Sequence, residues 1–386
     1  MLWGLAAGFS RLPSGLREES NDLDLYYRTA EALLRGEVPY RDFFIEYPPG
    51  SLPVFVPPAL LTDGRFAYIT AFATEMALAL LGALVLVALA ARRLYGPRGW
   101  PVPAAAFALG AVLLYPVAVT RYDAAVALAL AAAVLGAALG GRWLHLAYGA
   151  LGFGTAAKLV PALAVPPLVL ARREGALRGI AVFSTVAGLF VIPALLLGGG
   201  RFLESLAYHA QRGLQVESTA ASVLLFLGGA REVTFAYGAF EVRGGWAGEA
   251  LALTTPLTAA LLGVTALAAW RARRGGPLGA GGFARYAAAF VVAFMLGSKV
   301  LSPQYVIWLL PLVPLAAGGL TGGTLCAVLL AACWATTQVF PVHYQDLLSG
   351  ASPGPELLLL RNALLAALWA LLLALPQEAP AKEAAG

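Results

Sequence analysis

The sequence predicts an all-α, polytopic integral membrane protein, a bundle of about 10–12 transmembrane helices with large loops on the outer face. Of its 386 residues, 60% are hydrophobic and only 12% are charged, whereas soluble domains carry about twice that charged fraction. Apolar, uncharged runs at 76–91, 124–140 and 357–375 approach the roughly 20 residues that a helix needs to cross a bilayer. The alternating pattern of an outer-membrane β-barrel is absent, so the sequence favours helices.

Arginine clusters between the apolar runs indicate how the helices are oriented. Short cytoplasmic loops of membrane proteins carry an excess of basic residues. The net charge of +5 is divided among such clusters and is not gathered on one face, so a nucleic-acid partner is not expected. The clusters predicted to be cytoplasmic are Arg92, Arg93 and Arg98; Arg172, Arg173 and Arg178; and Arg271, Arg273 and Arg274.

With these clusters inside, the apolar runs thread through the membrane in order. The stretch 144–170 is too short for two full spans but begins and ends inside, so we expect two shortened helices that meet near Lys158 at the outer surface. The whole chain, 1–386, is predicted to be a single transmembrane domain with a cytoplasmic tail at 376–386. The inward runs are 66–91, 124–140, 246–270, 303–317 and 356–375, and the outward runs are 101–120, 178–197, 283–298 and 324–340.

Two long polar regions lie on the predicted outer side. The first, 17–65, holds a polar stretch of 34 residues that carries eight of the 21 acidic residues, and we expect interfacial helices in it. The second, 198–245, includes an apolar piece at 220–227 that is too short to cross and is predicted to be re-entrant or interfacial. Residues 1–16 are short for a span. The chemistry is therefore expected to face outward.

Neither a metal site nor a cofactor is expected. Cys326 and Cys333 are seven residues apart in one apolar run, which is too far along a helix for a disulfide. No cysteine and histidine residues follow a metal-ligand spacing. We interpret both cysteines as packed, small hydrophobic residues.

Lysine is rare in this chain, so its positions are informative. Arginine supplies 23 of the 26 basic residues, and two of the three lysines, Lys158 and Lys299, are in apolar segments that end at the outer surface. A charge within a membrane helix costs roughly 2.5–3.5 kcal/mol on insertion scales, which suggests a function, and an ammonium group suits a phosphate. The alternative is that both side chains extend to the lipid headgroups.

Two further outer-face groups are candidates for binding. Arg121 and Asp123 border an outer edge, where they either contact a substrate or form a surface ion pair of little energetic value. The run 208–218 is either a solvated loop or a binding segment. It offers cations for an anion and polar groups for hydroxyls: His209, Arg212, Gln215 and Glu217.

Acidic residues are candidates for proton transfer. Asp22 and Asp24 precede a helical pattern at 26–35, which either of them could cap. An exposed carboxylate at this position could also act as a general base toward a hydroxyl. Glu75 is a lone acid in an apolar helix, where it either pairs across the bundle or serves transport.

Motifs along the chain resemble glycosyltransferase family 87, the polyprenyl-phosphate-dependent mannosyltransferases and their relatives. Each motif is weak alone, but their order between residues 22 and 308 and their common outward side make the resemblance specific. The last motif also resembles the mannosyltransferase I group of glycosylphosphatidylinositol synthesis. The motifs are Asp22-x-x-x-Tyr26, Gly36-Glu37-Val38-Pro39-Tyr40, Asp42-Phe43, Glu46-Tyr47-Pro48-Pro49, Lys158-Leu159-Val160-Pro161, the run 212–218 and Ser302-Pro303-Gln304-Tyr305.

The resemblance implies a GT-C fold and an inverting transfer from a polyprenyl-phosphate sugar in the outer leaflet. An aspartate takes the proton of the acceptor hydroxyl, and Asp22 matches the family's position better than Asp24. Family members also have a full transmembrane helix before the polar stretch that contains Asp22. This sequence hardly has such a helix. The implied phosphate ligands are Lys158, His209, Arg212 and Lys299, and the implied sugar or acceptor contacts are Gln215, Glu217, Gln304 and Tyr305.

The sequence thus predicts a glycosyltransferase of a prokaryotic plasma membrane. It moves mannose or a related sugar from a lipid phosphate to a lipid or glycan acceptor on the outer face. The main alternative is a secondary transporter of a small solute, but no internal repeat is evident and only Glu75 favours it. The other is a non-catalytic scaffold of a glycan assembly system, which would tolerate loss of Asp22 and Lys158, whereas an enzyme would not.

Overall fold

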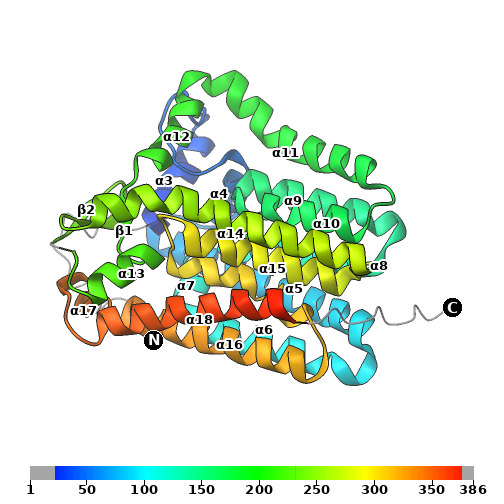
Figure 1. Cartoon of the computed structure of the whole chain (residues 1–386). Helices are drawn as coiled ribbons and strands as arrows, with labels where there is room; N and C mark the ends of the chain where they lie inside the picture. Colours follow the sequence, from blue (N-terminus) through cyan, green and yellow to red (C-terminus); the bar gives the residue numbers. More distant parts are fainter. Residues whose placement is uncertain (1–21, 231, 376–386) are drawn as a thin grey trace.

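The computed structural model describes residues 22–230 and 232–375 of the chain, and this part is almost entirely helical. Its long helices run side by side in one bundle (Figure 1). In the described part, six helices are long and apolar enough to cross a membrane. The predicted fold class, a polytopic all-α membrane protein, is confirmed. The six are α5 (Arg65–Gly99), α11 (Ala176–Gly198), α14 (Ala247–Gly275), α15 (Gly279–Gly297), α16 (Gly319–Thr337) extended by η6 (Gln338–Val342), and α18 (Gly354–Ala374).

Shorter helices and turns complete the bundle. The stretch 144–170 forms two short helical pieces on either side of Lys158, as predicted. The run 303–317, predicted as a span, consists of 3₁₀ turns, and Pro311 between them lacks the amide hydrogen that a continuous α-helix needs. The shorter elements are η1 (Pro49–Ser51), α4 (Leu52–Leu61), α6 (Pro101–Leu113), α7 (Tyr115–Ala118), α8 (Asp123–Leu139), η2 (Gly141–Trp143), α9 (Leu144–Ala157), η3 (Val160–Ala164), α10 (Val165–Ala171), η4 (Pro303–Leu309) and η5 (Val313–Leu315).

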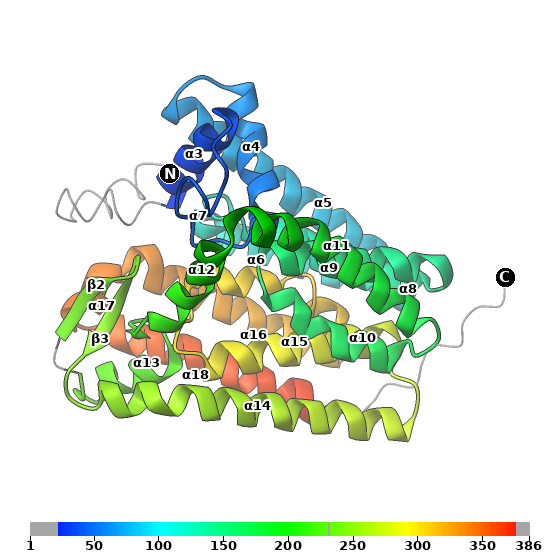
Figure 2. The same cartoon turned by 90° about the horizontal axis from the view of Figure 1, so that it is seen from above.

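The polar outer regions gather at one end of the bundle, which we call the site end (Figures 1 and 2). The three antiparallel strands there, in the order β1-β3-β2, were not predicted from the sequence. The piece at 220–227 is the short helix α13, and its insertion into the membrane stays a prediction. The elements are α3 (Asp22–Leu34), α12 (Gly200–Gln211), α13 (Thr219–Phe226), α17 (Tyr344–Ser349), β1 (Leu214–Gln215), β2 (Glu232–Ala236) and β3 (Ala239–Arg243). Residues 1–16 and the predicted tail at 376–386 lie outside the described residues.

The predicted cytoplasmic loops lie at the opposite end, where α5, α10 and α14 finish (Figure 1). Two of their arginines donate to carbonyl groups of neighbouring helices. Arg172 donates from Nη2 to the carbonyl of Ala137, and Arg273 donates from Nε to the carbonyl of Leu170, each at 3.0 Å. Basic side chains near the last turn of a helix satisfy carbonyl groups that have no partner within the helix. The arginine clusters and the polar regions therefore occupy opposite ends, as the predicted topology requires.

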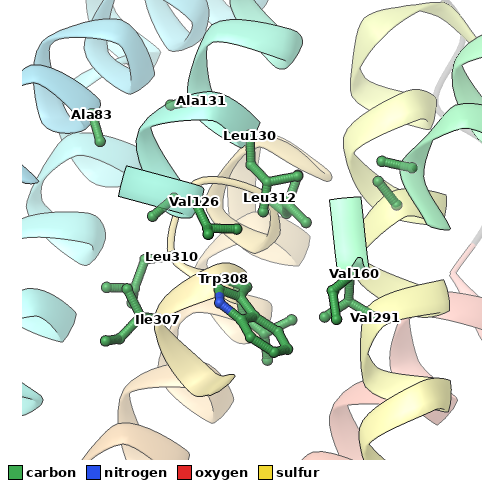
Figure 3. Packing of buried hydrophobic residues seen from close by; sticks show 14 of the residues in the cluster. Ala83, Val126, Leu130, Ala131, Val160, Val291, Ile307, Trp308, Leu310 and Leu312 are labelled. Carbon is green, nitrogen blue, oxygen red and sulfur yellow. The ribbon is translucent and has the colours of Figure 1, made fainter. Parts of the chain in front are cut away.

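A buried tryptophan links the site end to the hydrophobic core. Trp308 of η4 is fully buried and packs among Val126 and Leu130 of α8, Val160 of η3 and Val291 of α15 (Figure 3). Large aromatic side chains contribute much of the apolar area that a core buries. The packing fixes η4 against α8, and both elements carry polar residues of the candidate site.

Two close approaches hold the acidic loop between α3 and α4 against the bundle. A side chain at Gly50 would overlap the backbone of Ala156, at the end of α9, so only glycine allows this contact. A Cβ at Gly198, at the end of α11, would lie 2.6 Å from the Cβ of Tyr40. The hydroxyl of Tyr40 donates to the carbonyl of Tyr47 at 2.7 Å and closes the loop. These contacts bring the loop next to Lys158 and α12.

Candidate active site

A cavity of about 380 Å³ opens among the elements of the site end. Ten of the twelve residues predicted from the sequence line it, although they come from segments up to about 280 positions apart. Asp24 and Asp123 do not line it. The sequence therefore predicted most of the polar lining. The ten are Asp22, Arg121, Lys158, His209, Arg212, Gln215, Glu217, Lys299, Gln304 and Tyr305.

Asp22 begins α3 and faces Arg121 across the cavity wall. Oδ2 of Asp22 lies 2.7 Å from Nε of Arg121, and the side chains are 25% and 13% exposed. The N–H of Nε does not point at the carboxylate, so the contact is electrostatic and is not an aligned hydrogen bond. Within the described residues, no side chain donates a hydrogen bond to Asp22. Its carboxylate can therefore accept a proton from a hydroxyl in the cavity.

Asp24 is held by Arg65, the first residue of α5. Nη2 of Arg65 donates to Oδ2 of Asp24 at 3.0 Å, and Nε of Arg65 donates to Oδ1. The carboxylate of Asp24 is 11% exposed. A bidentate pair of this kind occupies both oxygens of an acid. Asp24 thus ties α3 to α5.

Lys158 and Asp123 form a buried pair beside the cavity. Nζ of Lys158 lies 2.8 Å from Oδ1 of Asp123, and Nε1 of Trp308 donates to the same oxygen at 2.7 Å. The ammonium also lies 4.8–5.3 Å from the ring centroids of Tyr122, Tyr305 and Trp308. Aromatic faces stabilise such a cation at these distances. The pair fixes Lys158 at the cavity wall.

The surface pair between Arg121 and Asp123 that the sequence suggested does not form. Each side chain has another partner, Asp22 for Arg121 and Lys158 for Asp123. Asp123 is fully buried because it starts α8 with its side chain against η4. Residues two apart at a helix start point in different directions, so proximity in sequence did not imply a contact.

Glu46, which we did not predict as a site residue, bonds two predicted ones, Arg212 and His209. Its Oε2 accepts a hydrogen bond from Nη2 of Arg212 at 2.8 Å, and its carbonyl accepts one from Nε2 of His209 at 2.8 Å. Lys299 donates from Nζ to the carbonyls of Ala210 and Arg212 at 2.7 and 2.6 Å. The end of α12 thus brings three basic side chains to one wall of the cavity.

Burial changes the proton affinity of several of these groups. It raises the pKa of Glu46, although Arg212 opposes the shift. It lowers the pKa of His209 and of Lys299. A neutral His209 that donates from Nε2 leaves Nδ1 as an acceptor, which suits a hydroxyl better than a phosphate. Arg212 and Lys299 are therefore the stronger candidates for an anion.

Gln215, the last residue of β1, and Glu217, two residues later, form a second polar wall. Nε2 of Gln215 donates to Oε2 of Glu217 at 3.0 Å and to Oγ of Ser302 at 3.2 Å. Oε1 of Gln215 accepts from the backbone N–H of Leu301 at 2.7 Å. Burial raises the pKa of Glu217 to about 7, and Arg361 and Arg121 oppose this shift. This wall carries an acid, whereas the wall at the end of α12 carries cations.

The profile of glycosyltransferase family 87 matches residues 44–303. The chain belongs to this family. Membership confirms the predicted family, and together with the six apolar helices it identifies a multi-pass membrane glycosyltransferase.

Two solved structures are similar to this family 87 protein. One is ArnT from Cupriavidus metallidurans bound to undecaprenyl phosphate, with 14% identity and a TM-score of 0.49, covering 96% of this chain and 75% of that chain. The other is the same protein in the apo state, with 15% identity and a TM-score of 0.47, covering 92% and 72%. No curated protein sequence matches the chain.

The family 87 site contains residues that the sequence analysis did not assign. Glu46 was part of a quoted motif, so the motif could have identified it. Arg361 is a charge within the apolar helix α18, the same kind of signal that identified Lys158, but its contact with the backbone of Glu217 could not be read from the sequence, and it does not itself line the cavity. Glu75 is not among the cavity residues, and the described part of the chain holds no cluster of metal-binding side chains. The other unassigned residues of the lining include Tyr47, Tyr122, Ser302, Trp308, Phe340, Tyr344 and Gln345.

Proposed function

We propose that this glycosyltransferase moves a sugar, mannose or a related one, from a polyprenyl-phosphate donor to a lipid or glycan acceptor on the outer face of the membrane. The transfer inverts the anomeric centre, and Asp22 is the general base. One observation carries the proposal. A carboxylate with open lone pairs and several cationic side chains line the same cavity at one end of a membrane-spanning bundle.

The proposed reaction uses the two kinds of charge in separate roles. Asp22 takes the proton of the acceptor hydroxyl, and the oxygen attacks the anomeric carbon as the bond from that carbon to the phosphate oxygen breaks. Negative charge then grows on the leaving lipid phosphate, where fixed cations stabilise it. Arg212 and Lys299 are the proposed direct ligands, because both line the cavity from the wall formed by the end of α12.

Lys158 acts in this scheme through its charge at the cavity wall. Its ammonium is already paired with Asp123 and enclosed by three rings, so it keeps one position during the reaction. Groups that need not reorganise stabilise a developing charge best. In this scheme His209 accepts a hydrogen bond from a hydroxyl through Nδ1, and Gln304 and Tyr305 contact the sugar or the acceptor.

The outward orientation of the site is also part of the proposal. The arginine clusters lie at the end of the bundle opposite to the cavity, and clusters of this kind mark the cytoplasmic side. A lipid donor lies with its phosphate at the membrane surface, which is the depth at which the cavity would open. A transporter gains no support, because Glu75 is not part of the cavity lining.

The test is transfer of labelled mannose from polyprenyl phosphate mannose to a lipid extract, by the purified wild type and the Asp22→Asn variant. We expect labelled lipid product from the wild type and none above background from the variant, with both proteins folded as judged by circular dichroism. GDP-mannose serves as the control donor and should give no product. Product that forms equally in the variant would exclude Asp22 as the base, and failure of the wild type with a panel of lipid-phosphate sugars would overturn the proposed function.

A further inference from the structure

Glu217 is an acid inside the cavity with one oxygen that nothing in the described chain satisfies. The residue is only 2% exposed, yet its side chain lines the cavity. Oε2 accepts a hydrogen bond from Gln215, whereas Oε1 is buried and has no hydrogen-bond partner among residues 22–230 and 232–375. A buried acceptor without a partner costs about 1–3 kcal/mol, so such an atom calls for an explanation.

The surroundings of Glu217 hold the side chain in one place. Both N–H groups of the Gln215 amide are used, by Glu217 and Ser302, and Oε1 accepts a hydrogen bond from the backbone N–H of Leu301. From the other side, Nη2 of the buried Arg361 donates to the backbone carbonyl of Glu217. Gln215 therefore has no N–H left to donate to a ligand, and its amide holds Oε2 of Glu217 in place. Oε1 of Glu217 is the buried side-chain oxygen of this pair that has no partner in the described chain.

The chemistry of this oxygen selects the ligand. A carboxylate repels a phosphate, so the anionic part of a donor belongs at the wall of Arg212 and Lys299. When the acid is ionised, Oε1 only accepts and needs an O–H or N–H donor. When the acid is protonated, Oε2 still accepts from Gln215, so Oε1 carries the proton and can donate it to a hydroxyl oxygen. A carbohydrate supplies several neutral O–H groups that fit a buried acceptor without adding charge.

We propose that Oε1 of Glu217 accepts a hydrogen bond from a hydroxyl of a substrate in the cavity and so makes the enzyme selective for substrates that carry this hydroxyl, with Gln215 as the positioning residue. The inference rests on the proposed function and adds a specificity residue to it. The hydroxyl belongs either to the sugar of the donor or to the acceptor, and the two sources differ in the kinetic constant that they affect.

The experiment compares wild type with Glu217→Ala and Glu217→Gln on polyprenyl phosphate mannose and its 2-, 3-, 4- and 6-deoxy forms, with a lipid extract as acceptor. In the wild type, removal of the contacted hydroxyl should lower kcat/KM about 10-fold to 100-fold, because the site then leaves a buried acceptor unpaired. The preference is the ratio of kcat/KM for the mannose donor to kcat/KM for the deoxy donor. In Glu217→Ala this ratio should fall to about one. In Glu217→Gln, which keeps the shape of the side chain, the ratio should be smaller than in wild type.

The outcomes separate the two sources and the two proposals. If Glu217→Ala loses the preference among donors, the hydroxyl belongs to the donor sugar. If the variant keeps that preference and only its KM for the lipid extract rises, about tenfold, the hydroxyl belongs to the acceptor. If neither changes while the wild type transfers sugar, the inference is wrong and the proposed function stands. If the wild type transfers nothing from any donor, both fail.

Glu75→Gln is the matched control. The same substitution there also changes a carboxylate with an unpartnered buried oxygen, but the residue lies in α5 and is not part of the cavity lining. Its preference among the deoxy donors should equal that of the wild type. If Glu217→Ala does not fold, Glu217→Gln carries the comparison alone, and an unchanged preference together with an unchanged KM for the lipid extract then overturns the inference.

Discussion

Asp22 and Asp24 carry the same functional group two residues apart on α3, but the fold gives them different surroundings. Asp22 lines the cavity, and Arg121 approaches it at 2.7 Å without an aligned hydrogen bond. Asp24 does not line the cavity, and two nitrogens of Arg65 bond its two oxygens. Helix positions two apart point about 200° away from each other, so only one of the two can face the cavity.

The comparison shows which property separates a candidate base from a structural acid. Both aspartates have an arginine partner, so pairing alone does not distinguish them. The bidentate contact of Arg65 uses both oxygens of Asp24, whereas Asp22 keeps lone pairs that a hydroxyl can reach. A general base must lie within hydrogen-bond reach of the proton that it removes. By this criterion Asp22 is the better candidate.

The largest expected effect is on turnover. Asp22→Asn should lower kcat by about 10³-fold, within the range typical for loss of a general base, while Asp24→Asn should keep most of the activity. Transfer of labelled mannose from polyprenyl phosphate mannose, at saturating donor, measures both variants in one assay. Equal loss in the two variants, with both proteins folded, would mean that the comparison does not identify the base.

Hydropathy and charge predicted the fold and its orientation from local information. Apolar runs of membrane length are properties of short segments, and the six long helices confirm that they were read correctly, whereas the orientation inferred from the arginine clusters stays a prediction. The 3₁₀ turns at 303–317 and the strands at 232–243 were not predicted, because prolines and cross-strand pairing changed the structure of segments whose composition was ambiguous. Tertiary context often overrides a local preference.

The candidate site shows the limit of sequence reasoning more clearly. The sequence named ten residues that line the cavity but could not pair them, because partners such as Glu46 and Arg212 are 166 positions apart. Spacing left Asp22 and Asp24 as alternatives, and only the family resemblance preferred one. The helix geometry and the position of Arg65 supply the physical reason for that preference.

A smaller effect is expected from the arginine partners. Arg121→Gln should lower kcat/KM about 10-fold to 100-fold, because Asp22 then loses the charge that holds it at the cavity wall, and a small misplacement of a reacting group is costly. Arg65→Gln should leave kcat/KM close to the wild-type value. Steady-state kinetics on both variants measure the difference. A larger loss from Arg65→Gln than from Arg121→Gln would place the more important pair at Asp24.

The smallest effect concerns the stability of the Asp24 pair. Arg65 is 42% exposed and Asp24 is 11% exposed, so the pair is partly screened by solvent, and we expect a coupling energy of about 1 kcal/mol in a double-mutant cycle. Thermal unfolding in detergent measures this as a melting temperature about one degree lower in Asp24→Asn, in Arg65→Gln and in the double variant alike. Additive losses in the double variant would mean that the two residues act independently. In that case Asp24 and Arg65 are not energetically coupled, and the argument that Asp24 is not the base would rest on helix geometry alone.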